Sequence, residues 1–388
     1  MRIFYLSSNL GVHDQRLLRS LAGTDHEVFL ITHYHGKDLP QKIMEIKGIS
    51  IINYNNPLAF SAGAEREPVM TRKIKCWTAF TKSLLRLKRD IKLMRPDVIH
   101  AGWTDAEGFL ARLSGFRPIL SMTWGSDVLV VPEMSWRLRV KTRYTLSRAD
   151  LIWSDCENVK GQIIKLINCR PEKIKVFPRG VDLGRFNQNV DVDLIRKKLR
   201  WQNKKIVLMT RSFKEIYGIE YFLRALPEIV KDCPDARVIL AGDGPLMDKF
   251  QALVNDLKLK EIVHFAGFIN NQDLPAYYNS ADVYVSSSLS DGTSNSLLEA
   301  MACGLPLVLS DVPSYCEWVA DGHNGYIVPR KDSQQLADRI IRLLKNKDQR
   351  RLFGSRNLEI ARQRADWGKN FGKLEEIYRE LVGIRNNA

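Results

Sequence analysis

Hydrophobic and polar positions alternate between two patterns along this chain. Short apolar runs typical of buried strands are followed by segments in which apolar residues recur every three or four positions, the period of a helix face. The first such unit joins a strand over 2–6, through a polar loop containing Gly11, to a helix over about 13–22. This β-α alternation predicts α/β architecture, with a parallel sheet covered by helices on both faces.

The same alternation continues to about residue 360 and is interrupted once. Further strand-like runs lie at 26–32, 96–100, 118–124, 151–154, 205–210, 236–246, 262–268 and 281–287. The interruption is Pro178-Arg179-Gly180-Val181-Asp182, after which a charged helix over 191–200 leads into a fresh strand. Since 388 residues exceed the usual size of a single core, we expect domains over 1–185 and 186–365 and a C-terminal amphipathic helix within 366–388.

A polar glycine loop after the strand 281–287 holds the chain's most specific chemistry. Asp291 lies in the loop and Glu299 in the helix that follows. The unpaired N–H groups and dipole of a helix start attract anions, so the segment suits the diphosphate of a sugar nucleotide. Asp291 could then accept hydrogen bonds from a hexose, and Glu299 from a ribose diol. The candidate donor-binding residues of this loop are Gly292, Thr293, Ser294, Asn295, Ser296 and Leu297. The alternative is a polar strand-to-helix connection without a ligand.

This stretch resembles the acidic-x7-acidic signature of the retaining family-4 glycosyltransferases, which have the GT-B fold. Asp291 and Glu299 have the required spacing, although Asp291 stands where most members have Glu, which indicates a subgroup. The resemblance runs from the opening strand to the final helix and is strongest over 282–328. It implies two Rossmann-like domains facing a cleft, a C-terminal helix crossing back to the N-terminal domain, a nucleotide sugar in the second domain and an acceptor in the first.

Arg211 ends the first strand of the second domain, where open α/β sheets bind their ligands. A guanidinium there can clamp a leaving diphosphate. The family has Lys six positions after this Arg and then Gly; Gly218 matches, but Tyr217 stands at the Lys position. Lys214 is therefore a substitute candidate, and a surface Arg at a strand end is the alternative. The resemblance also implies donor contacts, on weaker motifs, for Gly242, Gly244 and Gly267.

The first domain supplies candidates for the acceptor and the reacting sugar. Relatives bring backbone N–H groups to the diphosphate at the position of Gly11, and the absence of GxGxxG argues against a dinucleotide site. His13 and Arg16 are acceptor candidates, with helix capping as the alternative for His13. Many relatives read His-Gly-x-Asp where this chain reads Trp124-Gly-Ser-Asp127.

Asp127 and His100 are the first-domain candidates for contact with the sugar or acceptor hydroxyl. They complete the expected catalytic set with Asp291 and Arg211. The alternatives are a structural loop residue for Asp127 and a hydrogen-bonded core histidine for His100. No metal is required on this hypothesis, because Arg211 and the helix dipole supply the positive charge.

Positive charge is concentrated in the first half of the chain. Residues 1–200 contain 34 Lys and Arg against 20 Asp and Glu, whereas residues 201–388 contain 25 against 24. The segment 66–95 alone holds ten basic residues, around an apolar stripe expected to be core: Met70, Ile74, Trp77, Phe80, Leu84, Leu87, Ile91 and Met94. A second basic cluster comprises Arg137, Arg139, Lys141 and Arg143. An anionic membrane surface is the favoured partner, a merely solvated face is the alternative, and no nucleic-acid motif is present.

Composition narrows the remaining choices. The six cysteines have no CxxC or paired spacing, and no leader-like segment or bilayer-length apolar run occurs, so we expect a cytoplasmic protein, peripheral to the inner face of the membrane. The expected activity is hexosyl or N-acetylhexosaminyl transfer from a nucleotide diphosphate sugar to a glycan or lipid-linked acceptor in polysaccharide or lipopolysaccharide synthesis. A sugar-nucleotide epimerase and a non-catalytic protein on a decayed scaffold are the alternatives.

Overall fold

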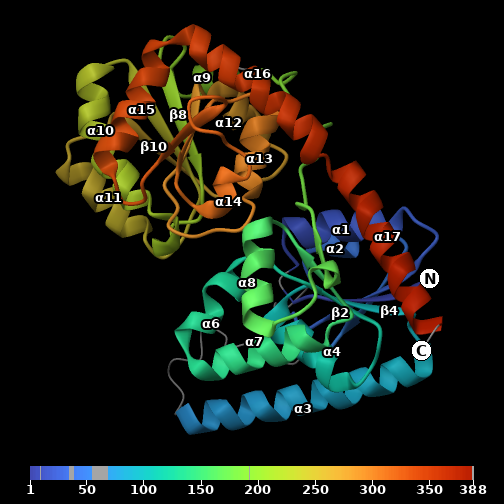
Figure 1. Cartoon of the computed structure of the whole chain (residues 1–388). Coiled ribbons are helices and arrows are strands. Elements are labelled where there is room, and N and C mark those ends of the chain that lie inside the picture. Colours follow the sequence, from blue (N-terminus) through green and yellow to red (C-terminus); the bar gives the residue numbers. More distant parts are fainter. Residues whose placement is uncertain (9, 35–38, 55–68, 192, 387–388) are drawn as a thin grey trace. The chain divides into compact units, whose positions relative to one another are not determined.

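The computed structural model describes the chain apart from residues 9, 35–38, 55–68, 192 and 387–388, and within the helix 69–94 it describes side chains from Trp77 onward. Contacts divide the chain into two compact units (Figure 1). Unit 1 comprises Met1–Phe177 and Phe371–Ala388, and unit 2 comprises Pro178–Asn370. Residues 178–185, expected at the end of the first domain, group with unit 2.

Unit 1 is built on a seven-stranded sheet in the order β3-β2-β1-β4-β5-β6-β7, with every pair parallel. Its strands are β1 (Arg2–Leu6), β2 (Glu27–Thr32), β3 (Ile49–Asn53), β4 (Val98–Ala101), β5 (Ile119–Met122), β6 (Leu151–Ser154) and β7 (Ile174–Val176). The order reverses between β1 and β4, so the sheet has a switch point beside β1, where doubly wound folds bind ligands.

The helices of unit 1 bury the apolar strands. They are α1 (Val12–Ala22), α2 (Gln41–Met44), α3 (Val69–Met94), α4 (Phe109–Ser114), α5 (Ser126–Leu129), α6 (Val131–Met134), α7 (Trp136–Arg148) and α8 (Glu157–Ile167), with short helical turns at Thr104–Gly108 and Pro171–Lys173. Phe4 and Ile99 of the sheet pack with Leu87 of α3 in one cluster. Ile152 packs with Ile163 of α8 in another.

The stripe expected on α3 is mostly core. Leu87 is fully buried, and Phe80, Leu84, Ile91 and Met94 pack against the same cluster. Trp77 departs from the expectation, because 67% of it is exposed. Met70 and Ile74 of the stripe, with Arg66, Arg72, Lys73 and Lys75 of the basic segment, lie outside the described side chains.

The last helix, α17 (Trp367–Asn386), packs onto unit 1 from Phe371 onward. Tyr378 is fully buried there and its hydroxyl lies 2.7 Å from Nδ1 of His100. Glu375 pairs with His26 at 2.9 Å. The expected return of the final helix to the N-terminal domain is confirmed.

Unit 2 is a six-stranded parallel sheet in the order β10-β9-β8-β11-β12-β13. Its strands are β8 (Lys205–Thr210), β9 (Ala236–Ala241), β10 (Val263–Gly267), β11 (Val283–Ser286), β12 (Leu307–Ser310) and β13 (Gly325–Val328). Its helices are α9 (Asp193–Lys198), α10 (Ile219–Asp232), α11 (Met247–Asp256), α12 (Leu274–Ser280), α13 (Asn295–Ala302), α14 (Pro313–Cys316), α15 (Ser333–Lys345) and α16 (Lys347–Arg364), with a short turn at Glu215–Tyr217.

Alternate residues of each strand in unit 2 enter different cores. Val207 packs with Phe222 of α10 on one face of the sheet, while Leu208 packs with Met301 of α13 on the other. Both faces are therefore covered, as the apolar strands require. The expected pair of Rossmann-like α/β domains is confirmed.

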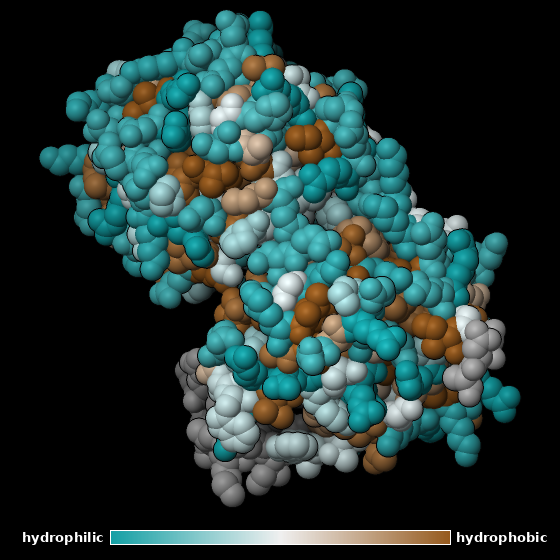
Figure 2. Space-filling view, in the orientation of Figure 1, coloured by the Kyte–Doolittle hydropathy of each residue, from teal (hydrophilic) through white to brown (hydrophobic). Residues whose placement is uncertain are grey.

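The surface is mostly hydrophilic, with apolar patches on both units (Figure 2). Among the described helices, none combines the length and hydropathy needed to cross a bilayer.

Candidate functional site

A cavity of about 200 Å³ opens in unit 2 at the carboxyl ends of β8, β9 and β10. Four of its lining residues decide its chemistry: Arg211 and Tyr217 after β8, Gly242 after β9, and Ser296 in the first turn of α13. Parallel strands point their carboxyl ends to one edge, so residues far apart in sequence meet here. Arg211, Gly242 and Ser296 were all expected at a donor site from the sequence.

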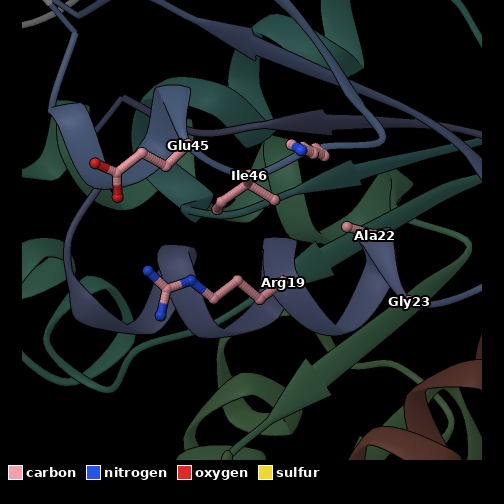
Figure 3. A pocket seen from close by; sticks show the side chains of 6 residues that line it. Arg19, Ala22, Gly23, Glu45 and Ile46 are labelled. Atoms are coloured by element: carbon pink, nitrogen blue, oxygen red, sulfur yellow. The ribbon is translucent and has the colours of Figure 1, made fainter.

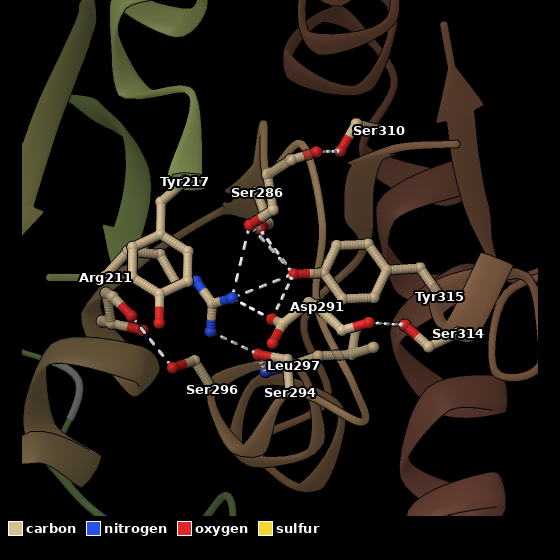
Figure 4. Close-up of polar contacts among 12 residues, drawn as sticks. Arg211, Tyr217, Ser286, Asp291, Ser294, Ser296, Leu297, Ser310, Ser314 and Tyr315 are labelled. Carbon is tan, nitrogen blue, oxygen red and sulfur yellow. Dashed lines mark hydrogen bonds and ion pairs between the residues drawn. The ribbon is translucent and has the colours of Figure 1, made fainter. Parts of the chain in front are cut away.

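The guanidinium of Arg211 is the centre of a polar network beside this cavity (Figure 4). It donates hydrogen bonds to Ser294 Oγ at 2.8 Å and Ser288 Oγ at 3.3 Å, and it forms an ion pair with Asp291. Its planar face lies 4.2 Å from the ring centre of Tyr217. The aromatic ring at the usual lysine position therefore supports the arginine by a cation–π contact.

The surroundings keep Arg211 charged although its side chain is only 8% exposed. Burial is the largest single influence and would lower the pKa of Arg211, but the charge of Asp291 and the neighbouring tyrosine hydroxyls together outweigh it, so the pKa is raised. Among the described residues, none accepts a hydrogen bond from the buried Nε–H of Arg211. One charged donor is thus available to an anion.

Tyr315 of α14 connects the members of this network. Its hydroxyl lies 2.9 Å from Asp291 Oδ2 and 3.2 Å from Arg211 Nη2. It also lies 3.1 Å from both Ser286 Oγ and Ser288 Oγ. Burial raises the pKa of Tyr315, so the hydroxyl remains a neutral donor to Asp291. Our reading of the sequence missed Tyr315, although it follows β12, whose carboxyl end lies at the same edge.

The loop after β11 folds into the expected helix start. Ser294 is the N-cap of α13, and its Oγ accepts a hydrogen bond from the Leu297 N–H at 3.4 Å. Ser296 Oγ donates to the Thr210 carbonyl at 2.9 Å and ties this helix start to the end of β8. Gly292, Thr293 and Leu297 are buried, whereas Asn295 and Ser296 are half-buried.

Glu299 lies one turn further along α13 and is half-buried. Its carboxylate accepts a hydrogen bond from the Tyr278 hydroxyl at 2.8 Å, and that hydroxyl lies 2.8 Å from Thr210 Oγ1. Burial and the charge of Glu299 together raise the pKa of Tyr278. Tyr278 therefore orients Glu299 relative to Thr210, which lines the cavity.

The weaker donor candidates differ in their placement. Gly242 lines the cavity and packs so closely that a Cβ there would lie 2.0 Å from the Arg211 carbonyl oxygen. Gly244 packs on the backbone of Phe213, where an added Cβ would lie 2.6 Å from the carbonyl oxygen, and this packing explains the glycine without any ligand. Gly267 precedes Phe268, which lines the cavity, whereas Lys214 is exposed and does not line it.

Unit 1 presents its own candidates at the carboxyl edge of its sheet. Gly11 is the N-cap of α1, and its N–H donates to Asp14 Oδ2 at 3.2 Å, so Gly11 and Asp14 do the capping considered for His13. The His13 ring instead packs 5.5 Å from the ring of Trp124, which stacks on Trp103 at 5.7 Å. Arg16 is half-buried in the next turn of α1.

Asp127 and His100 are both fully buried. Asp127 Oδ1 accepts the Trp124 N–H at 2.9 Å, and burial raises the pKa of Asp127. His100 is hydrogen-bonded to Tyr378, and burial lowers its pKa to about 3. These placements favour the structural alternatives, a loop carboxylate that shapes the Trp124 turn and a neutral core histidine.

Glu107 is a buried acid at this edge that our reading of the sequence missed. It is 4% exposed, and burial raises its pKa to about 7, with the charge of Asp14 adding to the rise. A Glu in a short helical turn has no distinguishing pattern in the sequence. Only its burial beside the β1–α1 loop makes it unusual.

A further cavity of about 390 Å³ lies at the other end of α1 (Figure 3). Arg19, Gly23, Glu45 and Lys47 are among its lining residues. None of the residues expected to act on a substrate lines it.

Comparison with known proteins identifies both halves of the chain. Residues 10–185 match the family described as Glycosyltransferase Family 4, and residues 191–359 match Glycosyl transferases group 1. An uncharacterized glycosyltransferase of Methanocaldococcus jannaschii, MJ1607, is 26% identical over 346 residues, which is 86% of this chain and 85% of that protein.

Two further proteins show the range of relatives. The GDP-mannose-dependent alpha-(1-6)-phosphatidylinositol monomannoside mannosyltransferase of Mycolicibacterium smegmatis is 26% identical over 282 residues, 70% of this chain and 72% of that protein. The crystal structure of Anabaena Alr3699/HepE in complex with UDP-glucose has a TM-score of 0.80 at 20% identity, covering 98% of this chain and all of that chain. Two family matches that together span most of the sequence, on a fold shared with solved glycosyltransferases, make this chain a member of the GT-B glycosyltransferases.

Proposed function

We propose that the protein is a retaining, metal-independent glycosyltransferase that moves a hexose or N-acetylhexosamine from a nucleotide diphosphate sugar to a hydroxyl of a glycan or lipid-linked acceptor. The observation that carries this proposal is Arg211, a buried guanidinium held by Asp291 and Ser294 at the rim of a strand-end cavity. It is a charged donor held in place by its protein neighbours. Such preorganised charge is what stabilises a departing diphosphate.

Each residue of the network has a role in this proposal. Glu299, oriented by Tyr278, accepts from the ribose diol, and Asp291 accepts from the sugar. Arg211 and the amides at the start of α13 hold the diphosphate. Because Arg211 and Asp291 already pair with each other, the incoming diphosphate and sugar hydroxyls would each take over one side of that pair. Gly242, which lines the cavity, and Gly267, next to the lining residue Phe268, would contribute further donor contacts.

The proposed reaction forms no covalent bond between the sugar and the protein, because the sequence offers no evident side-chain nucleophile. In the proposed retaining reaction, the acceptor hydroxyl attacks on the face from which the diphosphate leaves, and the leaving phosphate takes the acceptor proton. The bond from the anomeric carbon to the phosphate oxygen breaks, and a bond to the acceptor oxygen forms. His13 and Arg16 are the proposed acceptor contacts, and Gly11 contributes a backbone contact to the diphosphate.

The related proteins differ in the nucleotide of the sugar donor. One relative is named for GDP-mannose and one solved neighbour holds UDP-glucose, so relatedness alone favours neither base. The relative named for GDP-mannose is a phosphatidylinositol monomannoside mannosyltransferase. Its name supports a lipid-linked acceptor for this chain. A precursor of lipopolysaccharide or another cell-surface polysaccharide is the proposed acceptor class.

A lipid-linked acceptor requires contact with a membrane, and unit 1 carries a surface that fits one. Large apolar side chains are exposed on α3 and on α6–α7: Trp77, Leu85, Leu93, Met134, Trp136 and Val140 are each more than half exposed. The two regions are linked, because Phe80 of α3 stacks on Phe109 at 5.6 Å and Phe109 packs on Tyr144 of α7 at 6.2 Å.

Basic residues surround these apolar side chains. Leu85 has Lys82, Lys88 and Arg89 three or four positions away, all exposed on the same helix. Arg137, Arg139 and Arg143 accompany Trp136 and Val140 on α7. Apolar side chains set among lysines and arginines are typical of helices lying in the interface of an anionic bilayer. We therefore propose peripheral attachment through this surface, which we call the α3–α7 surface.

The donor proposal is tested by thermal shift and saturation-transfer NMR with UDP-, GDP- and ADP-sugars, on wild type, Glu299→Ala and the exposed control Glu359→Ala. One nucleotide class should stabilise wild type and the control but not Glu299→Ala. NMR of the product should then show retained anomeric configuration, with turnover unchanged by EDTA. Binding of no nucleotide sugar would refute the proposal, and sugar interconversion without an acceptor would indicate an epimerase.

The membrane proposal is tested separately by co-sedimentation with vesicles of phosphatidylcholine alone or mixed with phosphatidylglycerol. Wild type should bind only the anionic vesicles and lose binding as salt rises, since the attraction is screened. The double variant Trp136→Ser/Leu85→Ser should bind the anionic vesicles at least about tenfold more weakly, because each apolar side chain buried in the bilayer contributes about 1.5–3 kcal/mol. The control Leu352→Ser, exposed on α16, should bind as wild type does. Equal binding by all variants would contradict the assignment.

A further inference from the structure

A cavity of about 400 Å³ in unit 1 lies away from the residues assigned above. It is formed where α4 and α7 end, at the start of β5 and beside Ile384 of α17. Ile119, the first residue of β5, lines it. The cavity therefore opens at the amino edge of the sheet, opposite to the edge that carries Trp124 and Gly11.

The walls of this cavity carry an excess of positive charge. Four basic residues line it, Arg112, Arg117, Arg148 and Lys173, against a single acid, Asp150. The carboxylate is already used, because Asp150 pairs with Arg117 and accepts the Ile119 N–H at 2.8 Å. Three basic side chains are left without a carboxylate of their own in the wall.

Lys173 is held in the wall by neutral groups. Its ammonium donates to the carbonyl oxygens of Ser147 at 2.8 Å and Leu146 at 3.2 Å, in the last turn of α7. Burial is the main cause of the lowered pKa of Lys173, and the charge of Arg117 lowers it further. The charge of an anion in the cavity would oppose both effects, since it would favour the charged ammonium.

Arg112 presents an unused donor. Its guanidinium lies 5.1 Å from the ring centre of Tyr144, which fixes its orientation. The Nε–H of Arg112 is buried, and no acceptor for it occurs in the part of the chain that the structure describes. Arg148, exposed at the end of α7, provides a second guanidinium. Forked guanidinium donors match the oxygens of a phosphate group.

We infer that this cavity is a second anion site, which binds the phosphate group of a ligand other than the sugar donor. Arg112, Arg148 and Lys173 would bind the phosphate, and Arg117 would remain paired with Asp150. Phe116 and Ile384 add apolar wall beside the charges, so the organic part of a phosphate ester would also find contact. The phosphate could come from a lipid headgroup or from a free phosphorylated molecule. This inference stands independently of the proposed transferase activity.

The test measures binding to the full-length protein in a low-salt buffer free of phosphate. The two probes are inorganic phosphate and dihexanoyl phosphatidic acid, the latter below its micellar concentration. Isothermal titration calorimetry measures the binding of each probe. Arg112→Gln/Arg148→Gln removes the proposed donors. Arg351→Gln/Arg362→Gln removes the same charge from exposed positions on α16 and serves as the matched control. Arg148→Gln alone provides a variant that leaves the Arg112–Tyr144 packing intact.

The proposed donor site beside Arg211 would also attract phosphate, so all these variants are compared in an Arg211→Gln background. We expect both probes to bind in the Arg211→Gln background. Binding should weaken at least tenfold in the double variant Arg112→Gln/Arg148→Gln and measurably in Arg148→Gln. It should be unchanged in the control. Phosphatidic acid binding at least tenfold tighter than phosphate would assign the site to lipid headgroups, and equal binding would assign it to free phosphate. Loss of all binding with Arg211→Gln, or equal loss in the control, would overturn the inference.

Discussion

The hydroxyl of Tyr315 lies within hydrogen-bonding distance of Arg211, Asp291, Ser286 and Ser288. A single neutral group thus fixes the position of both charges in the candidate donor site. Since preorganised charge loses its effect when it can reorient, this hydroxyl should matter for turnover as well as for stability. It contacts the proposed catalytic groups but not the cavity, so we regard Tyr315 as a positioning residue.

Removing only that hydroxyl tests this role. Tyr315→Phe keeps the buried ring and should lower the free energy of unfolding by about 1–2 kcal/mol, the usual cost of a lost buried hydrogen bond. Transfer should fall by about tenfold, because Asp291 and Arg211 become free to shift. The control Tyr326→Phe loses one hydrogen bond to Gln349 away from the network and should leave transfer unchanged. Urea unfolding and initial rates distinguish the two effects; an unaffected rate in Tyr315→Phe would rule out the positioning role.

Glu107 provides a pH test at the same scale. Its pKa is about 7 in the folded protein against 4.5 for an ordinary Glu, so the folded state binds the proton more tightly than the unfolded state. The free energy of unfolding should therefore fall as pH rises from about 4.5 to 7 and then level off, a change on the order of 3 kcal/mol. Glu107→Gln should abolish that contribution.

The corresponding measurement is urea unfolding at pH 4.5 and pH 8. Glu107→Gln should match wild type at the lower pH and be more stable at the higher one, because the variant buries no charge. Glu376→Gln, an exposed change on α17, should leave the pH dependence as it is. A wild-type profile without this fall would mean that Glu107 is ionised in the folded protein.

At the scale of elements, the candidate donor site depends on how closely the ends of β8 and β9 approach. Gly242 has φ of +154°, and an added Cβ would lie 2.0 Å from the Arg211 carbonyl oxygen and 2.8 Å from its carbonyl carbon. Backbone atoms cannot yield as a flexible side chain can. The glycine therefore maintains the spacing of the two strand ends around the cavity.

Gly242→Ala should separate those strand ends. We expect a loss of at least about 2 kcal/mol in the free energy of unfolding, as for overpacked sites, together with loss of nucleotide-sugar binding. Gly322→Ala is the matched control, since it also has positive φ, at +70°, but open space around the new Cβ. It should cost about 1 kcal/mol from backbone strain alone. Thermal shift with and without donor measures both; equal effects in the two variants would mean that the close approach is unimportant.

At the scale of the whole molecule, unit 1 is formed by two separate parts of the chain. Residues 1–177 form most of it, residues 178–370 form unit 2, and α17 then completes unit 1. Tyr378 is the buried anchor of that return, with its hydroxyl on His100. Unit 1 consequently depends on the last residues of the chain, whereas unit 2 is a continuous segment. The two units should therefore respond differently to damage in α17.

Tyr378→Ala should destabilise unit 1 by about 3–5 kcal/mol, as large-to-small core changes do. Tyr378→Phe should cost only about 1 kcal/mol, the loss of one hydrogen bond. Calorimetry with and without a donor nucleotide should show one transition shifted in Tyr378→Ala, while the donor-stabilised transition of unit 2 stays in place. A uniform shift of both transitions would mean that the units unfold as one.

Local periodicity made the fold predictable, because apolar runs and helix stripes depend on residues close in sequence. The two parallel sheets and the final helix were predicted in this way. The burial of the α3 stripe was also predicted, except at Trp77, because the exposure of that side chain depends on what packs around it. The clustering of Arg211 with Asp291 and Ser294 also followed, since strand ends meet at one edge whatever the details.

The sequence by itself determined the α/β class, the order of the two domains and the carboxylates and arginine at the second sheet's edge. Only the tertiary structure decided their partners. Tyr315 meets Arg211 across 104 positions, and Tyr378 meets His100 across 278. Such contacts depend on how whole elements pack, and no local pattern encodes them. Burial likewise makes His100 a neutral core residue, because solvent exclusion is a property of the folded chain. The packing of α4 and α7 against the start of β5 brings four basic residues to the cavity at the amino edge of the first sheet.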